Sequence, residues 1–352
     1  MNYSLILITL WMVFAGAVET SMLNGTESSA ACKQGPVPEK MREVIQKLAK
    51  EEKKKNKQVQ NLGKRQESPI HVAVYIHIVT RSNPGSSNLT SASNQTNPAE
   101  IIDKLNHGFS SAGISFTLAG VDTTVNEQWA VNSDGEVQSQ MQEALHKGSP
   151  RDLNLYYVDL VGGKPQPVVS GSCSYPADAE LNLKLDGCII TEDGLREKHG
   201  SSTIHEVGHW FGLPHTFPDR WAFDPATSTY TEKPGDGCDE DGDLIDDTPF
   251  ESWNASLTLF TCEIGRDSCP DKPGVDPIHN YMDYTTDDCR TEFTPGQITR
   301  MHGLWKQYRA SATILEPEPS LLPWTGDSNA TDVPEEPQES QSAAPDEEGS
   351  QL

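Results

Sequence analysis

Apolar side chains recur along this sequence with two periods, which predict two kinds of secondary structure. Alternation of apolar and polar residues indicates strands, because successive side chains of a strand point to opposite faces. Strands are predicted in this way at 70–80, 114–121, 152–161 and 187–191. Apolar residues three and four positions apart indicate helices with one buried face. Helices are predicted at 98–112, 136–147, 202–211 and 294–309.

The regular pattern breaks off after the helix that ends near residue 211. Gly, Pro, Asp and Cys dominate from there to Pro295, which stands at the start of the closing helix. This order predicts an α+β fold whose upper lobe is a twisted mixed sheet with backing helices. The irregular stretch and the closing helix would form a lower lobe, and ~230 residues are enough to bury the core of one such domain.

The first residues predict secretion. The apolar run at 5–18 is too short to span a bilayer and ends in Ala15-Gly16-Ala17, so a signal peptide is expected at 1–17. Later segments are neither long nor apolar enough to span a membrane. We therefore expect a secreted, extracellular monomer without stable membrane association. Candidate glycosylation sites are Asn24, Asn88, Asn94, Asn254 and Asn329.

Composition divides the rest of the chain. A polar, Lys-rich stretch from Met41 ends in Lys64-Arg65, which predicts a partly helical pro-segment at 18–65 with a processing point at its end. Residues 66–310 would then form the catalytic domain. The chain from 311 to 352 contains no Lys or Arg and is rich in Glu, Asp, Pro and Ser, which predicts a disordered acidic tail. The net charge of −25 argues against a nucleic-acid partner, because phosphate binding needs a positive surface.

The chemistry is indicated by the run His205-Glu206-Val207-Gly208-His209-Trp210-Phe211-Gly212-Leu213-Pro214-His215. His205 and His209 are four positions apart, so both rings project from one face of a helix. Gly212 can take the left-handed conformation that turns the chain and brings His215 to the same ion. Three histidines leave the fourth position of a tetrahedral zinc open for water, and Glu206 is placed to act on that water as a general base.

Alternatives to a catalytic zinc site remain at this stage. The histidines could lie on the surface of an ordinary helix, and three imidazoles also suit copper, nickel or cobalt. Downstream, Met282 could form an apolar floor under the imidazoles, or it could be plain core. Tyr284 could donate to the oxyanion of the reaction, or it could be a packed aromatic residue.

A longer series of motifs resembles one family. The motifs are the histidine run, His215-Thr216-Phe217, Asp247-Thr248-Pro249, Gly265-Arg266-Asp267-Ser268-Cys269-Pro270, Asp276-Pro277-Ile278-His279-Asn280-Tyr281-Met282-Asp283-Tyr284 and Phe293-Thr294-Pro295-Gly296-Gln297. Together they resemble the secreted fungal extracellular metalloproteases of the pappalysin-like metzincins (peptidase family M43B). The resemblance implies a zinc endopeptidase with a two-lobed metzincin fold, an active-site helix in the upper lobe, a Met-turn at Met282, disulfides and, as in relatives, calcium.

Seven cysteines in a secreted chain predict disulfides and one odd thiol. The odd cysteine is expected to be Cys32 in the pro-segment, where its thiolate could occupy the open zinc position until the segment is removed. The alternative is a thiol that faces solvent or is mispaired. Six cysteines allow fifteen pairings. The family resemblance favours Cys262 with Cys289, and Cys238–Cys269 and Cys173–Cys188 would complete the set.

Two groups of carboxylates are further candidates. An acidic loop follows the third histidine and could hold Ca²⁺, or it could simply be solvated; it contains Asp236, Asp239, Asp241, Asp243, Asp246 and Asp247. Asp287 and Asp288 follow the Met-turn and could line the primed side of a substrate cleft, or they could face water.

These residues predict hydrolysis of polypeptides by a zinc-activated water, with Glu206 as the base. The competing class is a secreted zinc-binding adhesive or interaction protein on a metzincin scaffold without proteolysis. The presence of Glu206 argues against that class, because only hydrolysis requires a base there. A third possibility is a hydrolase that acts on a lipid or an amidated small molecule.

Overall fold

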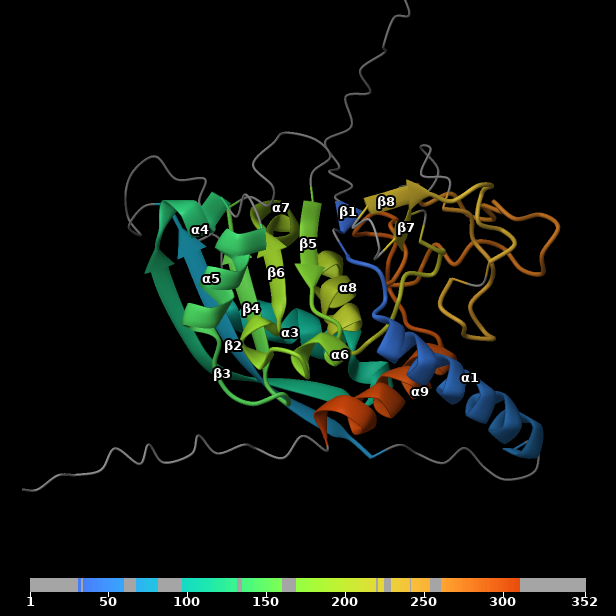
Figure 1. The fold of residues 1–352 in the computed structure, drawn as a ribbon, viewed down its shortest axis with the longest axis horizontal. Coiled ribbons are helices and arrows are strands. Elements are labelled where there is room, and N and C mark those ends of the chain that lie inside the picture. The colour runs from blue at the N-terminus through green and yellow to red at the C-terminus, as the bar shows by residue number, and fades with distance from the viewer. Residues whose placement is uncertain are drawn as a thin grey trace, which may run out of the picture. The chain divides into compact units, whose positions relative to one another are not determined.

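A mixed sheet, six-stranded in the part of the chain described, forms the centre of the computed structural model (Figure 1). The structure describes residues 31–32, 34–59, 68–81, 97–131, 135–159, 169–219, 221–224, 229–240, 242–253 and 261–310. The predicted signal peptide, Lys64-Arg65, the acidic tail and the candidates Asn24, Asn88, Asn94, Asn254 and Asn329 lie outside these residues.

Most of the sheet is parallel. Its strands are β1 (Ala31–Cys32), β2 (Ile70–Thr80), β3 (Ile114–Val125), β4 (Leu153–Val158), β5 (Val169–Cys173) and β6 (Cys188–Thr191), in the order β1-β5-β6-β4-β2-β3. The pairs β3–β2, β2–β4 and β4–β6 are parallel, β6–β5 is antiparallel, and β5–β1 is parallel. Strand β5 is therefore the antiparallel member, with the short strand β1 on its outer side.

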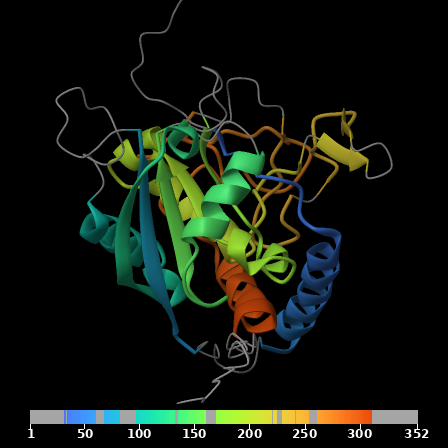
Figure 2. The same ribbon diagram turned by 60° about the vertical axis from the view of Figure 1, so that its left-hand side comes forward.

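Helices cover both faces of the sheet (Figure 2). They are α3 (Pro98–Gly108), α4 (Glu127–Val131), α5 (Gly135–Leu145) and α8 (Ser201–Trp210). Leu105 of α3 and Val207 of α8 join Val74 and Ile76 in one apolar core, whereas Met141 of α5 packs with Tyr156 on the other face. Burial on both faces explains why β4 is buried along its whole length, as is usual for parallel sheets.

Four short elements lie along the chain before α8. They are a 3₁₀ turn at Ser110–Ala112, α6 (Pro176–Ala179) with a 3₁₀ turn at Leu183–Leu185, and α7 (Glu192–Arg196). Past Gly212 the described residues before α9 are irregular except for the hairpin of β7 (Trp221–Asp224) and β8 (Thr229–Glu232). It becomes regular again at α9 (Pro295–Leu304), which continues as one wider turn at Trp305–Arg309.

The predicted pro-segment contains the long helix α1 (Glu39–Val59), which lies beside α9 in both views (Figures 1 and 2). Met41 and Ile45 are buried against Leu304 and Tyr308. At the other end of this contact the carboxylate of Glu52 accepts two hydrogen bonds from Arg300, at 3.2 and 3.0 Å. No helix within the described ranges is long and apolar enough to cross a membrane.

The predicted α+β architecture is confirmed, and the differences are local. Strand β3 extends to Val125 rather than 121, because it pairs with β2 over the whole of that length. Strands β1 and β5 were not predicted. Both are short, and β5 carries Ser, Gly and Cys instead of an alternating apolar pattern.

Asp287 caps the start of α8. Its carboxylate accepts hydrogen bonds from the backbone N–H groups of His199 (2.8 Å) and Ser201 (2.9 Å), which have no partner inside the helix. Asp288 instead pairs with the exposed His199 ring at 2.8 Å and is itself 66% exposed. The predicted primed-side role of these two carboxylates is untested, and Asp287 has a structural task.

The cap predicts a difference between two neighbouring substitutions. Asp287→Ala should lower the free energy of unfolding by about 1 kcal/mol, because it leaves helix N–H groups without an acceptor. For a domain of this size, that corresponds to a fall of roughly 2–4 °C in Tm. Asp288→Ala is the matched control and should change Tm little, since exposed ion pairs contribute little. Equal shifts in thermal unfolding would contradict the capping role.

Candidate active site

Three histidines converge beside α8. His205 and His209 come from successive turns of the helix, and His215 follows a turn at Gly212, whose φ of 95° lies in the left-handed region. The Nε2 atom of His209 is 3.1 Å from that of His205 and 3.2 Å from that of His215. All three residues are buried, so we refer to His205, His209 and His215 as the histidine triad.

Hydrogen bonds determine which ring nitrogen carries the proton in two of these histidines. The Nδ1 atom of His205 donates to the carbonyl of Tyr281, and that of His209 donates to the carbonyl of Leu213, both at 2.7 Å. A neutral ring that donates through Nδ1 has a bare lone pair at Nε2. Burial lowers the pKa of His209 to about 3 and holds that of His205 well below its usual value, so both rings are neutral.

This donor set fits a zinc ion. The Nε2 lone pairs of His205 and His209 face one another, and two acceptors cannot form a hydrogen bond between them. Zinc–nitrogen bonds of ~2.0–2.1 Å in tetrahedral geometry separate the ligand nitrogens by ~3.3 Å, close to the observed spacing. Zinc-ligating histidines typically donate their other ring N–H to a carbonyl, as His205 and His209 do here.

Glu206 lies next to the triad in a buried position. Its side chain packs against Gly171 of β5, where an added Cβ would come within 2.7 Å of the Glu206 Cγ atom. Neither carboxylate oxygen has a hydrogen-bond partner of ordinary geometry in the described part of the chain. Burial raises the pKa of this carboxyl to about 8, against the opposing effects of the Cys32 thiol and the Arg290 guanidinium. A raised pKa makes the ionised carboxylate a stronger base, which is the property that a general base needs.

The predicted Met-turn packs against α8. Met282 is fully buried, and its sulfur would be 2.4 Å from a Cβ added to Gly208, so the helix can approach only through a glycine. The side chain of Asn280 accepts a hydrogen bond from the Met282 N–H (2.9 Å) and is held by Gln297 of α9. The position of Met282 therefore depends on the closing helix.

Tyr284 also faces the triad. Its ring lies 4.8 Å from that of His215 and 5.7 Å from that of His205, measured between centroids. The hydroxyl donates to the backbone carbonyl of Cys32 at 3.0 Å. Burial holds the pKa of this phenol well above its usual value, so the hydroxyl remains a donor.

Cys32 of strand β1 is brought to the same place. Its Sγ atom and one nitrogen from each triad histidine all lie within 4.8 Å of one another. Burial and the neighbouring Glu206 raise the pKa of this thiol well above its usual value. Gln34, two residues on, accepts a hydrogen bond from the backbone of Cys173 in β5 at 3.3 Å. The segment of Cys32 thus passes close to the triad while it pairs with β5.

The other six cysteines are paired. The structure joins Cys262 to Cys289, Cys238 to Cys269 and Cys173 to Cys188, and Cys32 is the free thiol of the described residues. The first two disulfides cross-link the irregular stretch between α8 and α9. The third links β5 to β6 beside Glu206. These are the pairs that the sequence analysis named.

The described carboxylates of the acidic loop do not converge on one point where an ion could bind. Five of its carboxylates contact separate partners: Asp236 the Cys238 N–H, Asp239 the Lys272 ammonium, Asp243 the Ile245 N–H, Asp246 the Lys53 ammonium and Asp247 the Gly296 N–H. They do not form a converging ligand group among the described residues, and Asp241 lies outside those residues. The calcium site stays a prediction.

Two features of the site were missed in the sequence. Gly171 gives Glu206 its space, and a glycine inside a strand is a known signal of close approach, but the strand itself was not predicted. Arg290 lies near Glu206 and donates to Ser202 on α8 at 3.2 Å. A single arginine in an irregular stretch gives no pattern that could have placed it there.

Comparisons with known proteins show which family the chain resembles. The family of peptidase M43, described as pregnancy-associated plasma protein-A, matches residues 153–306. An extracellular metalloprotease of Pyricularia oryzae is 39% identical over 251 residues, which are 69% of this chain and 78% of that protein. An extracellular metalloprotease of Podospora anserina is 40% identical over 253 residues, with 69% and 76% covered.

Solved structures share the fold. The mature mirolysin of Tannerella forsythia, in complex with a cleaved peptide, is similar with a TM-score of 0.50 and 22% identity over 70% of this chain and 97% of that chain. A promirolysin mutant of the same organism has a TM-score of 0.50 and 22% identity, over 78% of this chain and 94% of that chain.

The contact between Gly171 and Glu206 predicts the effect of one methyl group. Gly171→Ala should displace the carboxylate and lower kcat by up to ~100-fold, because small misplacements of catalytic groups have effects of that size. Gly135→Ala is the control, since its added Cβ would have no atom within 4 Å. Steady-state hydrolysis of a protein substrate checks this. Equal rates for Gly171→Ala and the wild type would show that Glu206 does not need its present position.

Proposed function

Because this chain belongs to the peptidase M43 family of metalloendopeptidases, we propose that the histidine triad holds its catalytic zinc and that Glu206 is the general base. The similarity to mirolysin confirms the predicted metzincin fold. The enzyme is a zinc-dependent protease that acts on polypeptides. The observation that carries the residue assignment is the buried Glu206 carboxylate beside three histidines, with the Nε2 atom of His209 lying 3.1 Å from that of His205 and 3.2 Å from that of His215.

The side chains divide the reaction between them. The bound zinc ion supplies Lewis acidity and lowers the pKa of water toward neutrality. Glu206 takes a proton from the attacking water and then gives it to the leaving amine nitrogen. The Tyr284 hydroxyl, a donor that now bonds the Cys32 carbonyl, would donate to the negative charge that develops on the substrate carbonyl oxygen.

Strand β5 supports a polypeptide substrate over a lipid or a small amide. Its outer edge already pairs with an extended segment, because Ala31 and Cys32 of β1 lie in register with Val169 and Gly171. An edge strand offers regularly spaced N–H and C=O groups that recognise a peptide backbone. Gly171 stands on this edge beside Glu206, so a peptide bound there would cross the catalytic groups.

We further propose that the pro-segment keeps the enzyme latent. The Cys32 thiol has the position of a fourth ligand to the triad, and β1 occupies the edge of β5 that a substrate would use. Helix α1 anchors the segment through Met41, Ile45 and the bonds of Glu52 to Arg300. The similarity to promirolysin, which extends over more of this chain than the similarity to the mature form, supports this assignment.

Several finer expectations belong to the same proposal. The extracellular location of the relatives supports a signal peptide at 1–17 and secretion. Release of the segment 18–65 would follow Lys64-Arg65, leaving a catalytic domain at 66–310 and the acidic tail. A calcium ion in the acidic loop and a monomeric state are retained as predictions. Calorimetric titration of the chain with Ca²⁺ and sedimentation would test these two.

The binding-protein alternative is separated from the enzyme by one substitution. Glu206→Gln removes the base but leaves the triad, so the variant should retain zinc while kcat for casein falls by ~10²–10⁴-fold. Glu143→Gln, on the exposed face of α5, is the matched control. Zinc content and casein cleavage are measured together. A wild type that binds zinc but cleaves nothing after removal of residues up to Arg65 would favour the adhesive protein.

Removal of the Cys32 thiol alone tests the proposed latency. Cys32→Ala should activate the unprocessed chain, because the position beside the triad becomes free for water. If the thiol blocks nine-tenths of the molecules, activity rises by ~10-fold. Activity is measured while a gel verifies that the pro-segment is intact. A variant as inactive as the unprocessed wild type would show that β1, and not the thiol, blocks the site.

A further inference from the structure

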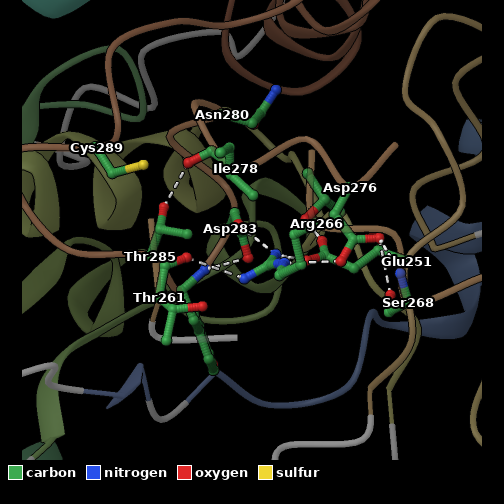
Figure 3. A network of polar contacts seen from close by, with 12 residues as sticks. Glu251, Thr261, Arg266, Ser268, Asp276, Ile278, Asn280, Asp283, Thr285 and Cys289 are labelled. Carbon is green, nitrogen blue, oxygen red and sulfur yellow. Dashed lines mark hydrogen bonds and ion pairs between the residues drawn. The ribbon is translucent and has the colours of Figure 1, made fainter. Parts of the chain in front are cut away.

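Arg266 lies at the centre of a buried polar cluster in the irregular stretch (Figure 3). Its side chain is only 5% exposed. The Nε atom donates to Asp276 at 2.7 Å, and a terminal nitrogen donates to Asp283 at 3.0 Å and also to Glu251. The other terminal nitrogen donates to the carbonyl of Thr261 at 3.3 Å. One guanidinium thus holds carboxylates from three separate segments.

One carboxylate of the cluster, that of Glu251, bonds to the residue that follows the third histidine. The Oε2 atom of Glu251 accepts a hydrogen bond from the hydroxyl of Thr216 at 2.7 Å. Thr216 directly follows His215 and is 1% exposed. Its backbone N–H donates to the carbonyl of Met282 at 3.3 Å. The chain at His215 is therefore tied both to the cluster and to the Met-turn.

A second carboxylate of the cluster, that of Asp283, belongs to the segment of Met282 and Tyr284. Asp283 stands between Met282 and Tyr284, and its Oδ1 atom accepts the Tyr284 N–H at 2.6 Å. Its Oδ2 atom is the one that binds Arg266. The guanidinium therefore connects the segment of His215 to the segment of Met282 and Tyr284 through charged hydrogen bonds, which are the strong ones.

The third histidine has a particular need for such support. His205 and His209 are each oriented by an Nδ1 bond to a backbone carbonyl. Across the described chain, His215 shows contacts of a different kind, namely its Nε2 contact with His209 and ring contacts such as the stack on Phe217 at 4.9 Å. Its place must then come from the backbone on which it stands, and Thr216 is the part of that backbone that the cluster holds.

We propose that Arg266 and Thr216 are positioning residues for the zinc site, which set the place of His215 through Glu251. The inference rests on the proposed function, because it concerns the same triad. Neighbours of metal ligands that act in this way typically change metal affinity or activity by ~10–100-fold when they are removed. The cluster would act on affinity for the metal and on kcat, and it would leave substrate recognition at β5 unchanged.

Thr216→Val tests this link with little other change. It removes the hydroxyl that joins the segment of His215 to Glu251, keeps the volume of the side chain and leaves Arg266 with its carboxylates. Thr216→Ser restores the hydroxyl. Ser149→Ala is the matched control, since it removes a hydroxyl bond to a carboxylate, that of Asp152, in a distant turn. The full secreted chain is titrated with Zn²⁺ against a competing chelator, and kcat and KM are measured on the same preparations after removal of residues up to Arg65.

The expected result is a zinc dissociation constant raised by ~10–100-fold in Thr216→Val. Affinity should return close to the wild-type value in Thr216→Ser and be unchanged in Ser149→Ala, with kcat lowered and KM preserved in Thr216→Val. Equal zinc affinities for Thr216→Val and Ser149→Ala would overturn the inference. Should Thr216→Val fail to fold, Glu251→Gln takes its place with the same expectation. If every variant binds zinc and none cleaves casein, the proposed function fails while the affinities still decide the role of Thr216.

Discussion

The site depends on one constraint: three neutral imidazoles must be held in a buried place with their lone pairs aimed at one point. The Nε2 atoms lie 3.1 and 3.2 Å apart, which is unfavourable without a cation between them. Each contribution comes from a different piece of the fold. Helix α8 fixes the spacing of two rings, the left-handed Gly212 turns the chain toward the third, and the segment of Tyr281 orients His205 from below. A shift of any of these pieces would separate the nitrogens.

Buried arginines explain how an irregular region can meet such a constraint. Arg266 joins loops that have no helix or strand to hold them. Arg309 acts similarly at the end of α8, where it donates to the carbonyl of Trp210 and pairs with the buried Asp186. A guanidinium can bond several partners in fixed directions. Together with the disulfides Cys262–Cys289 and Cys238–Cys269, these contacts replace the backbone ladders that position residues in the upper lobe.

The sequence predicted the parts of the molecule whose cause is local. The helix spacing of His205 and His209, the turn at Gly212 and the alternation of β2 all arise from neighbouring residues, and the structure has them where they were expected. It did not predict β5, which is short and poor in apolar residues and exists because β6 pairs with it. Nor did it place Arg266 among its carboxylates, because the partners come from 251, 276 and 283 and only the tertiary fold brings them together.

In the latency that we propose, β1 and the substrate would compete for a single edge of β5. Strand β1 comprises two residues, and each backbone hydrogen bond contributes only about 1 kcal/mol net, so β1 alone would be a weak blocker. The thiol of Cys32 and the buried face of α1 add separate contacts on one chain. Because these contacts are on one chain, binding of α1 keeps β1 and Cys32 at a high effective concentration near the triad. Cleavage between α1 and β2 would leave α1 bound by its own contacts, and the enzyme would become active only as this helix and β1 dissociate together.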